Sequence, residues 1–354
     1  MNWESIFKEP HVWLDASGPS GDVVVSSRVR LARNLLDIPF PARLNVEGRH
    51  ALVELVLNAA RASASLSAAR YVDLSLAKKT ERQFLMERHL VSPEMVADSQ
   101  ERGVLIGPGQ DVTLMIHEED HLRLQSFSAG LSLREAWAKA DRADTELGEL
   151  LPFAFDAEWG FCTRCPTNAG TGMRASCLLH LPALEMNGDI ERVLDGLAQM
   201  GVAARGFYGE RSNAIGDLFQ ISNAVSLGHT ETELLETIER VVQSIVNYER
   251  QGRQSLLEPR RKSATEDQIW RAWGLLRHAR LISYDETMSH LSQIRLGLQM
   301  GLPLPVKPAT LNRLMLVTQP AHLQLLKGST LKAEERDRWR ATLIREKLGA
   351  ISNV

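Results

Sequence analysis

Residues 23–33 of the chain are VVVSSRVRLAR, and this stretch decides the fold. Its β-branched residues and its alternating pattern predict a strand with one buried face. Side chains alternate along a strand, so Arg28 and Arg30 should lie on the same face, about 7 Å apart. Two guanidinium groups at this spacing suit a phosphate chain. A solvated strand face is the alternative interpretation, and this pair alone does not exclude it.

On either side of this strand, the first 250 residues mix strand and helix patterns. Two further strands are predicted at 112–127 and at 162–181, the second interrupted by the Gly-rich turn NAGTG. Helices are predicted at 47–66, 131–147 and 230–250, where they would cover one face of a sheet.

The last 90 residues have helical patterns almost throughout. Residues 251–264 are polar and basic and contain a Gly and a Pro, as an interdomain linker does. A capping-box pattern at 265–268 then predicts the start of a helix. Later helices are predicted at 284–300, 307–326 and 330–348. The predicted fold is therefore α+β, with a sheet domain at 1–250, a linker at 251–264 and a smaller all-α domain at 265–354.

The bulk composition is that of an ordinary globular protein. A chain of 354 residues favours two domains, or one large domain with an appendage. Its 41 basic and 44 acidic residues give a net charge of −3, so no nucleic-acid partner is expected. The sequence has neither a run of about 18 apolar residues nor the start of a targeting peptide, so we expect a protein without a membrane partner.

The three cysteines are Cys162, Cys165 and Cys177. With no secretion signal, they favour a reducing cytoplasm. The CxxC pair at 162 and 165 lacks the second pair of ligands that a tetrahedral zinc site needs, so no metal site is expected there.

Residues 117–123, HEEDHLR, form a second polar cluster, inside the strand predicted at 112–127. Three successive acids in a strand are unfavourable unless they face a ligand, a metal or a cationic substrate. A regular strand would place Glu119, His121 and Arg123 on one face. A carboxylate beside a phosphate-binding arginine suits a cationic acceptor, whereas an acidic edge strand that resists aggregation is the alternative.

Two Gly-containing segments follow. In residues 162–176, CTRCPTNAGTGMRAS, backbone N–H groups of a turn could line an anion, with Arg174 directly after it. No GKS or GKT follows, which excludes a P-loop. Residues 205–212, RGFYGERS, indicate either a loop that closes over a substrate or a plain surface turn. Cys165 is equally compatible with a thiolate beside guanidinium groups and with a small buried residue.

Taken together, SSRVR, EEDHLR, CPTNAGTGMRAS and RGFYGE resemble, in this order, motifs of the ATP:guanido phosphotransferase family, which includes creatine kinase and arginine kinase. The resemblance covers most of residues 20–230. It implies a catalytic domain with a central, largely antiparallel sheet flanked by helices. It also implies transfer of the γ-phosphate of ATP to a guanidino group, with Mg²⁺ bound through the nucleotide.

The resemblance extends to the roles of single residues. Glu119 would bind and help deprotonate the acceptor, with the Cys165 thiol beside it and Glu210 on the other side. The residues implied to bind the nucleotide are Arg28, Arg30, Arg123, Arg174 and Arg205, with Ser27, Ala175 and Ser176. Phosphoryl transfer requires positioning and charge neutralisation, which five fixed guanidinium groups would supply. An acceptor arginine has a pKa above about 12, so it needs a nearby carboxylate.

Within this family the chain resembles the bacterial protein arginine kinases more than the metabolite kinases. Only 25 residues precede SSRVR, where metabolite kinases have a helical domain, so the acceptor pocket should admit a side chain of a polypeptide. Residues 336–341, RDRWRA, resemble the phosphoarginine-binding site of these kinases, which implies an allosteric site at Arg336, Asp337 and Arg340. A charged helix face is the alternative.

Three positions depart from the family pattern. His117 stands where Asn is usual, which should change a supporting hydrogen bond. Arg211 follows Glu210 where a small residue is usual, so the role of Glu210 is the least secure. Leu178 stands where metabolite kinases have a His near the adenine, which implies different contacts to the base.

The partners implied by the resemblance are protein substrates, an activator protein, a Clp-type AAA+ protease and a second copy of the chain. Stress-damaged proteins would be the substrates. One alternative is a kinase for free arginine or another small guanidino metabolite. A weakly active adaptor that binds phosphoarginine is the other.

Overall fold

The computed structural model describes residues 6–7, 9–206 and 214–349 and contains a large antiparallel sheet. Within these residues, eight strands follow the order β2-β3-β4-β5-β1-β8-β10-β9, and all neighbouring strands are antiparallel. The strands are β1 Val24–Arg33, β2 Arg70–Asp73, β3 Gly103–Ile106, β4 Val112–Ile116, β5 Leu122–Ala129, β8 Met173–His180, β9 Val202–Gly206 and β10 Leu218–Asn223. The predicted α+β fold with an antiparallel sheet is confirmed, and the strand predicted at 23–33 is β1.

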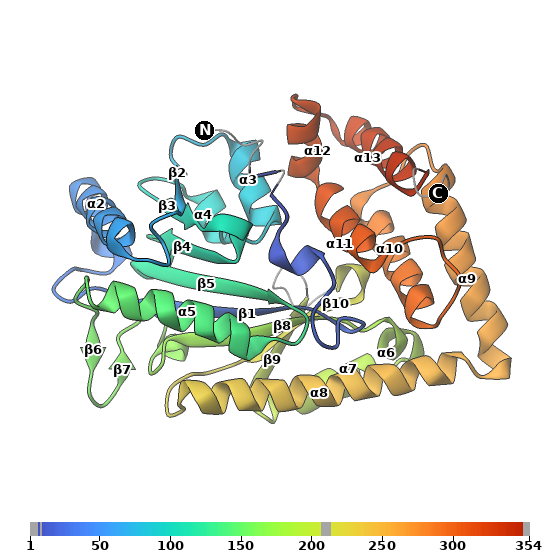
Figure 1. The fold of residues 1–354 in the computed structure, drawn as a ribbon, viewed down its shortest axis with the longest axis horizontal. Helices are drawn as coiled ribbons and strands as arrows, with labels where there is room; N and C mark the ends of the chain where they lie inside the picture. Colours follow the sequence, from blue (N-terminus) through green and yellow to red (C-terminus); the bar gives the residue numbers. More distant parts are fainter. Residues whose placement is uncertain (1–5, 8, 207–213, 350–354) are drawn as a thin grey trace.

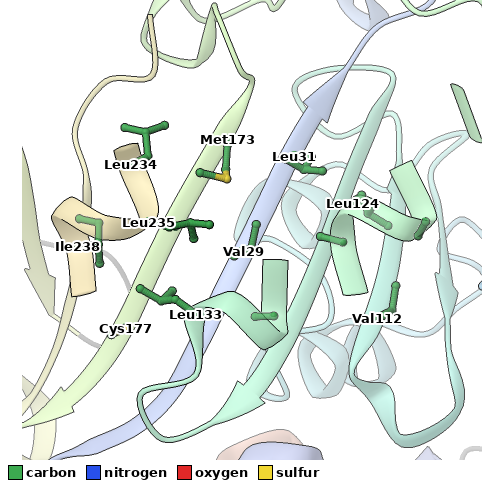
Figure 2. Close-up of a cluster of buried hydrophobic side chains, with 14 of the residues drawn as sticks. Val29, Leu31, Val112, Leu124, Leu133, Met173, Cys177, Leu234, Leu235 and Ile238 are labelled. Carbon is green, nitrogen blue, oxygen red and sulfur yellow. The ribbon is translucent and has the colours of Figure 1, made fainter. Parts of the chain in front are cut away.

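One face of this sheet is covered by helices, as predicted (Figure 1). These helices are α2 Val46–Ala62, α5 Leu133–Gly148 and α8 Glu231–Leu256. Val29 and Leu31 of β1 lie in one buried cluster with Leu133 and Ile238 from α5 and α8 (Figure 2). Because side chains alternate along β1, burial of Val29 and Leu31 turns the neighbouring arginines toward the opposite face.

The stretch predicted as one strand at 112–127 is two strands, β4 and β5, and this prediction was wrong. The HEEDH residues form the tight connection between them, where His117 adopts φ 60°. Both flanking runs are apolar and β-rich, which hides the reversal between them. The strand predicted at 162–181 is also shorter, because β8 begins only at Met173, after the small hairpin of β6 Phe155–Asp156 and β7 Gly160–Phe161.

The predicted linker at 251–264 is mostly helical. Helix α8 continues to Leu256 and α9, Pro259–His278, begins three residues later, so only residues 257–258 separate them. Thr265 is not an N-cap. It lies inside α9, where its hydroxyl donates to the Arg261 carbonyl at 3.1 Å. Polar residues on the exposed side of a long helix gave this stretch the composition of a loop.

The chain ends in a group of helices beside one end of the sheet (Figure 1). Their bounds are α10 Tyr284–Gln299, α11 Pro308–Val317, α12 Pro320–Lys327 and α13 Ala333–Gly349. The helix predicted at 307–326 is divided into α11 and α12, and Pro320 begins the second because proline is favoured in a first helical turn. Smaller helices lie between the strands, namely α3 Lys79–Glu87, α4 Pro93–Ala97, α6 Pro182–Asn187 and α7 Ile190–Ala198.

The C-terminal helices share a core with the sheet. Trp13, Val25 and Phe127 belong to the same buried cluster as Trp273 and Ile294. A buried carboxylate adds a polar link, since Glu87 of α3 accepts hydrogen bonds from the first backbone N–H groups of α12, at 2.8 and 3.0 Å. Among the residues described, no helix combines the length and the apolar character needed to cross a membrane.

Candidate functional site

Arginine side chains gather on the face of the sheet opposite α2, α5 and α8. Strand register is the cause, since Arg30 of β1 is paired with Arg174 of β8, and Ala32 with Arg123 of β5. Farther along the sheet, Gln220 of β10 is paired with Arg205 of β9. Paired residues, and alternate residues of one strand, share a face, and neighbouring strands are about 4.8 Å apart. Residues far apart in the chain therefore converge.

A cavity of about 540 Å³ lies over this face. Its lining includes all five arginines predicted to bind phosphates together with the predicted catalytic carboxylate: Arg28, Arg30, Arg123, Arg174, Arg205 and Glu119. The predicted shared face of Arg28 and Arg30 is confirmed. The cavity is also lined by two arginines that sequence reasoning missed, Arg102 and Arg164.

The arginine cluster is electrostatically unfavourable without an anion. Burial, with the charges of Arg123 and Arg174, lowers the pKa of Arg28 to about 10. Burial, with the charges of Arg28, Arg123 and Arg174, lowers the pKa of Arg30 well below its ordinary value. Burial and the charge of Arg205 lower the pKa of Arg174. A ligand with several negative charges would relieve this repulsion, as the triphosphate of a nucleotide would.

The two glutamates of the HEEDH connection lie in different surroundings. Glu118 is 4% exposed and forms an ion pair with Arg123 at 2.6 Å. Glu119 is 36% exposed at its side chain and lies 3.8 Å from Arg123. Burial and the neighbouring Asp120 raise the pKa of Glu119, whereas Arg123 opposes this rise. Glu118 thus holds an arginine in place, and Glu119 has room to meet a cationic ligand.

The other members of the HEEDH connection point away from the cavity. His121 is fully buried, accepts from the Leu35 N–H at 3.0 Å and donates to the Pro39 carbonyl at 2.8 Å. The prediction that His121 shares a face with Glu119 and Arg123 was therefore wrong, because this segment is a turn. His117 donates to the Arg49 carbonyl at 2.9 Å, so this departure from the family pattern changes a hydrogen bond outside the cavity.

Two residues implied to bind the nucleotide lie on the other face of the sheet. Ser27 is fully buried, and its hydroxyl donates to the Gly130 carbonyl at 2.7 Å. Ala175 is buried in the cluster beneath the helices. Neither side chain lines the cavity, because each alternates with an arginine that does. Ser176 lies on the arginine face, in a small cavity next to the large one that Trp13, Phe127 and Leu178 also line.

Cys165 lies close to the cavity without lining it. The thiol is half-buried, with its sulfur 3.0 Å from the Thr167 hydroxyl. The charge of Cys165 acts to raise the pKa of Arg174, whereas burial lowers it. The two side chains are therefore near each other. This location beside Arg174 is compatible with the role that the family resemblance implies for the thiol.

The predicted loop begins at the cavity. Arg205 and Gly206 end β9, and Arg205 lines the cavity. Glu210 and Arg211 lie outside the described residues.

The predicted phosphoarginine site in α13 is largely engaged in internal contacts. Arg340 is 1% exposed and donates to the carbonyls of Thr318 and Ile282 at 2.8 and 2.9 Å. The same guanidinium pairs with Asp337. Arg336 donates to the Leu331 carbonyl at 2.8 Å. In this arrangement Arg336 and Arg340 do not form an open pair at the surface, because Arg340 holds α13 to the neighbouring loops.

Over the described ranges, no group of three or more His, Cys, Asp or Glu side chains is placed to hold a metal ion. A magnesium ion would therefore depend on the phosphates of a bound nucleotide for most of its ligands. Glu118 and Glu119 are carboxylates that line the same cavity as the arginines.

Sequence reasoning missed further residues with clear positions in the site. The Gln220 amide oxygen accepts from Arg28 at 2.8 Å and so orients this guanidinium. Arg28 also lies over the Phe127 ring, 5.7 Å from its centroid. Only strand register reveals that these residues meet. Glu118 is different, since its position next to Glu119 in a run of acids was a signal that the sequence offered.

The chain matches two protein families over successive regions. Residues 51–252 match the family described as ATP:guanido phosphotransferase, C-terminal catalytic domain, and residues 262–354 match the protein-arginine kinase McsB C-terminal domain. The chain is 43% identical to the protein-arginine kinase of Desulforamulus reducens, with 96% of each chain covered. It is 41% identical to that of Halothermothrix orenii, with 95% of this chain and 96% of the relative covered.

Solved structures show a similar fold over about two thirds of the chain. The substrate-free duplicated taurocyamine kinase from Schistosoma mansoni is 27% identical, with a TM-score of 0.58, and 68% of this chain matches 35% of that one. A structure of the same duplicated kinase with bound transition-state analogue components gives a TM-score of 0.60 at 27% identity, over 68% of this chain and 34% of that chain.

Proposed function

Because the chain belongs to the ATP:guanido phosphotransferase family, with protein-arginine kinases as relatives over nearly its whole length, we propose that it transfers the γ-phosphate of ATP to arginine side chains of proteins. The observation that carries this proposal is the cavity in which five arginines from four strands surround the space beside Glu119.

The arginines would bind the triphosphate. Arg28 and Arg30 of β1 and Arg174 of β8 form a contiguous cationic surface. Arg123, fixed by Glu118 at 2.6 Å, extends this surface toward Glu119. Fixed guanidinium groups neutralise charge on the transferred phosphoryl group without reorganising during the reaction.

Glu119 would receive the acceptor guanidinium. Its carboxylate would orient the guanidinium and take a proton as the terminal nitrogen attacks the γ-phosphorus. A new N–P bond forms, the bond from the γ-phosphorus to the β,γ-bridging oxygen breaks, and ADP leaves. The raised pKa of Glu119 makes this carboxylate a better proton acceptor than an ordinary glutamate.

Magnesium fits the site through the nucleotide. The ion, when bound to the phosphates, would neutralise part of their charge and hold their oxygens in one arrangement. The chain would contribute through Glu118 and Glu119, which line the same cavity.

The finer parts of the function rest on the family alone. We propose that arginine phosphorylation marks stress-damaged proteins for a Clp-type protease in the cytoplasm, that an activator protein participates, and that the chain forms a homodimer. We also propose that Cys165 and Glu210 take part at the acceptor side, and that Arg336, Asp337 and Arg340 bind phosphoarginine. The last proposal requires Arg340 to exchange an internal contact for a phosphate, which titration of phosphoarginine without nucleotide would test.

The central experiment is incubation of the purified chain with ATP, magnesium and an unfolded protein. We expect acid-labile phosphate on arginine residues, located by mass spectrometry, and at least about 100-fold less product with Glu119→Ala. Arg134→Ala changes an exposed arginine of α5 and serves as the control that keeps activity. Absence of phosphoarginine from the wild-type reaction, or equal product from Glu119→Ala, would reject the proposal.

The same assay with free arginine separates a metabolite kinase from a protein kinase. We expect turnover on the protein acceptor to exceed that on free arginine. The reverse preference would favour the metabolite kinase.

A further inference from the structure

Asn34 directly follows β1 and joins three segments of the site. Its side chain is 2% exposed. The amide nitrogen donates to Asp120 Oδ1 at 2.7 Å and to the Cys162 carbonyl at 2.9 Å. The amide oxygen accepts from the His121 N–H at 2.9 Å. All three hydrogen bonds are made to segments more than 80 positions away in the chain.

Asp120 is the second member of this junction. It is 1% exposed, and the Oδ1 atom that accepts from Asn34 also accepts from the Arg164 N–H at 2.8 Å. The Oδ2 atom is buried and has no hydrogen-bond partner among the described residues. Asn34 and Asp120 together therefore fix the backbone of the HEEDH connection and that of the segment that contains Cys162 and Arg164.

Each of the three joined segments carries a group of the proposed reaction. The strand that ends before Asn34 carries Arg28 and Arg30, and the HEEDH connection carries Glu119. The third segment carries Arg164, which lines the cavity. The charge of Asp120 raises the pKa of Glu119, whereas that of Arg164 lowers it. The positions of these two residues therefore influence the pKa of the Glu119 carboxylate.

An asparagine is specifically suited to this position. The junction needs two donated hydrogen bonds and one accepted bond from a single short side chain, which an amide provides. Aspartate has the same shape but cannot donate, and its charge would lie next to Asp120. Alanine would leave the buried Asp120 carboxylate, the Cys162 carbonyl and the His121 N–H without this partner.

We propose that Asn34 is a positioning residue for phosphoryl transfer, which fixes the Glu119 connection and the Cys162–Cys165 segment against the arginine-bearing strand. Asn34 itself touches neither nucleotide nor acceptor, since it does not line the cavity. The expected effect on turnover rests on the proposed function. The expected effect on the structure rests on the hydrogen bonds alone.

The test compares Asn34→Ala and Asn34→Asp with the wild-type chain. We expect kcat to fall about 100-fold in Asn34→Ala, since misplacing a reacting group by about 1 Å has an effect of this order. Asn34→Asp should fall at least as far despite its shape. KM for ATP should stay within about 3-fold, because the arginines remain on their strands.

Asn187→Ala is the matched control. Asn187 of α6 likewise joins separate segments, through hydrogen bonds to the Gly252 carbonyl and the Ser255 hydroxyl of α8, but it lies outside the arginine cavity. This variant should lose stability while keeping its kcat. Asn34 would have no positioning role if Asn187→Ala lowered kcat as much as Asn34→Ala, or if Asn34→Asp kept wild-type kcat.

Hydrogen exchange supplies a readout that does not depend on activity. In Asn34→Ala, the amides of His121 and Arg164 should exchange at least about 10-fold faster than in the wild type, with helix α8 unchanged. Unchanged exchange at both amides would overturn the inference, whether or not turnover is detected. A wild-type chain that forms no phosphoarginine would instead reject the proposed function.

Discussion

Glu118 and Glu119 are neighbours in the chain with different surroundings in the folded protein. Glu118 is buried, pairs with Arg123 at 2.6 Å and accepts from the Glu119 N–H at 2.8 Å. Glu119 is more exposed and lies 3.8 Å from Arg123. At the scale of single residues, one acid therefore maintains the site and the other is available to a substrate.

This difference predicts separate effects of two substitutions. Glu118→Ala should lower kcat and also destabilise the fold, by about 1–3 kcal/mol, because it leaves buried donors unpaired. Glu119→Ala should lower kcat with a change in stability below about 0.5 kcal/mol. Turnover assays and denaturant unfolding measure both effects. Equal destabilisation by the two variants would contradict the division of roles.

The surroundings of Glu119 also predict a pH dependence. A general base must be ionised, and the pKa of Glu119 is raised, so kcat should decline on the acid side at higher pH than for an ordinary glutamate. Arg164 opposes this rise, so Arg164→Ala should move the decline to still higher pH. Arg134→Ala, at an exposed position of α5, should leave it in place. pH–rate profiles with one protein acceptor measure these shifts, and a move to lower pH in Arg164→Ala would contradict the argument.

At the scale of helices and strands, the sequence patterns predicted those elements whose formation depends on residues close together in the chain. The strand at 23–33 and the helices over one face were correct, since apolar periodicity determines which side is buried. The turn at HEEDH was missed because apolar strands flank it, and the helical linker because its polar residues face solvent. Gln220, Arg102 and the contacts of Asn34 depend on register between distant segments, which no local pattern encodes.

Glu87 caps α12, and its ionisation should make the stability of the protein depend on pH. Burial raises the pKa of Glu87 to about 7, although the hydrogen bonds from the Ala321 and His322 N–H groups act to lower it. The folded state therefore binds a proton more tightly than the unfolded state, so this group's contribution to stability declines as pH rises from about 4.5 to about 7. A shift of this size corresponds to at most about 3 kcal/mol.

Replacement of Glu87 should remove that dependence. In Glu87→Gln, the free energy of unfolding should fall less between pH 5 and pH 8 than in the wild type. Denaturant titrations at several pH values measure the difference. Glu233→Gln, in the exposed cap of α8, is the control, because Glu233 is solvated and its pKa is lowered instead. A parallel pH dependence in wild type and Glu87→Gln would contradict the assignment.

At the scale of the whole molecule, the sheet and the C-terminal helices share one buried cluster. Trp13 and Phe127 from the sheet side are packed with Trp273 and Ile294 from the helical side. Arg295 adds a hydrogen bond to the Gly21 carbonyl at 2.8 Å. A substitution that leaves a cavity in this cluster therefore removes packing contacts from both the sheet and the C-terminal helices.

Ile294→Ala should therefore destabilise the entire chain. Ile294 is fully buried, so the expected loss is about 2–5 kcal/mol. Tryptophan fluorescence and circular dichroism should report one coincident transition at lower denaturant. Val46→Ala, at an exposed position, should leave the midpoint unchanged. Two separate transitions, with only the helical signal shifted, would show that the parts unfold independently.

The crowding of like charges in the cavity has a consequence for ligand choice. Nucleotides should be ranked first by the number of their phosphates, triphosphate above diphosphate above monophosphate, and only second by the base. Inorganic triphosphate should then compete with ATP, and raising the ionic strength should weaken both, because mobile ions screen the attraction. Product release follows from the same ranking, since ADP leaves with one phosphate fewer to hold it.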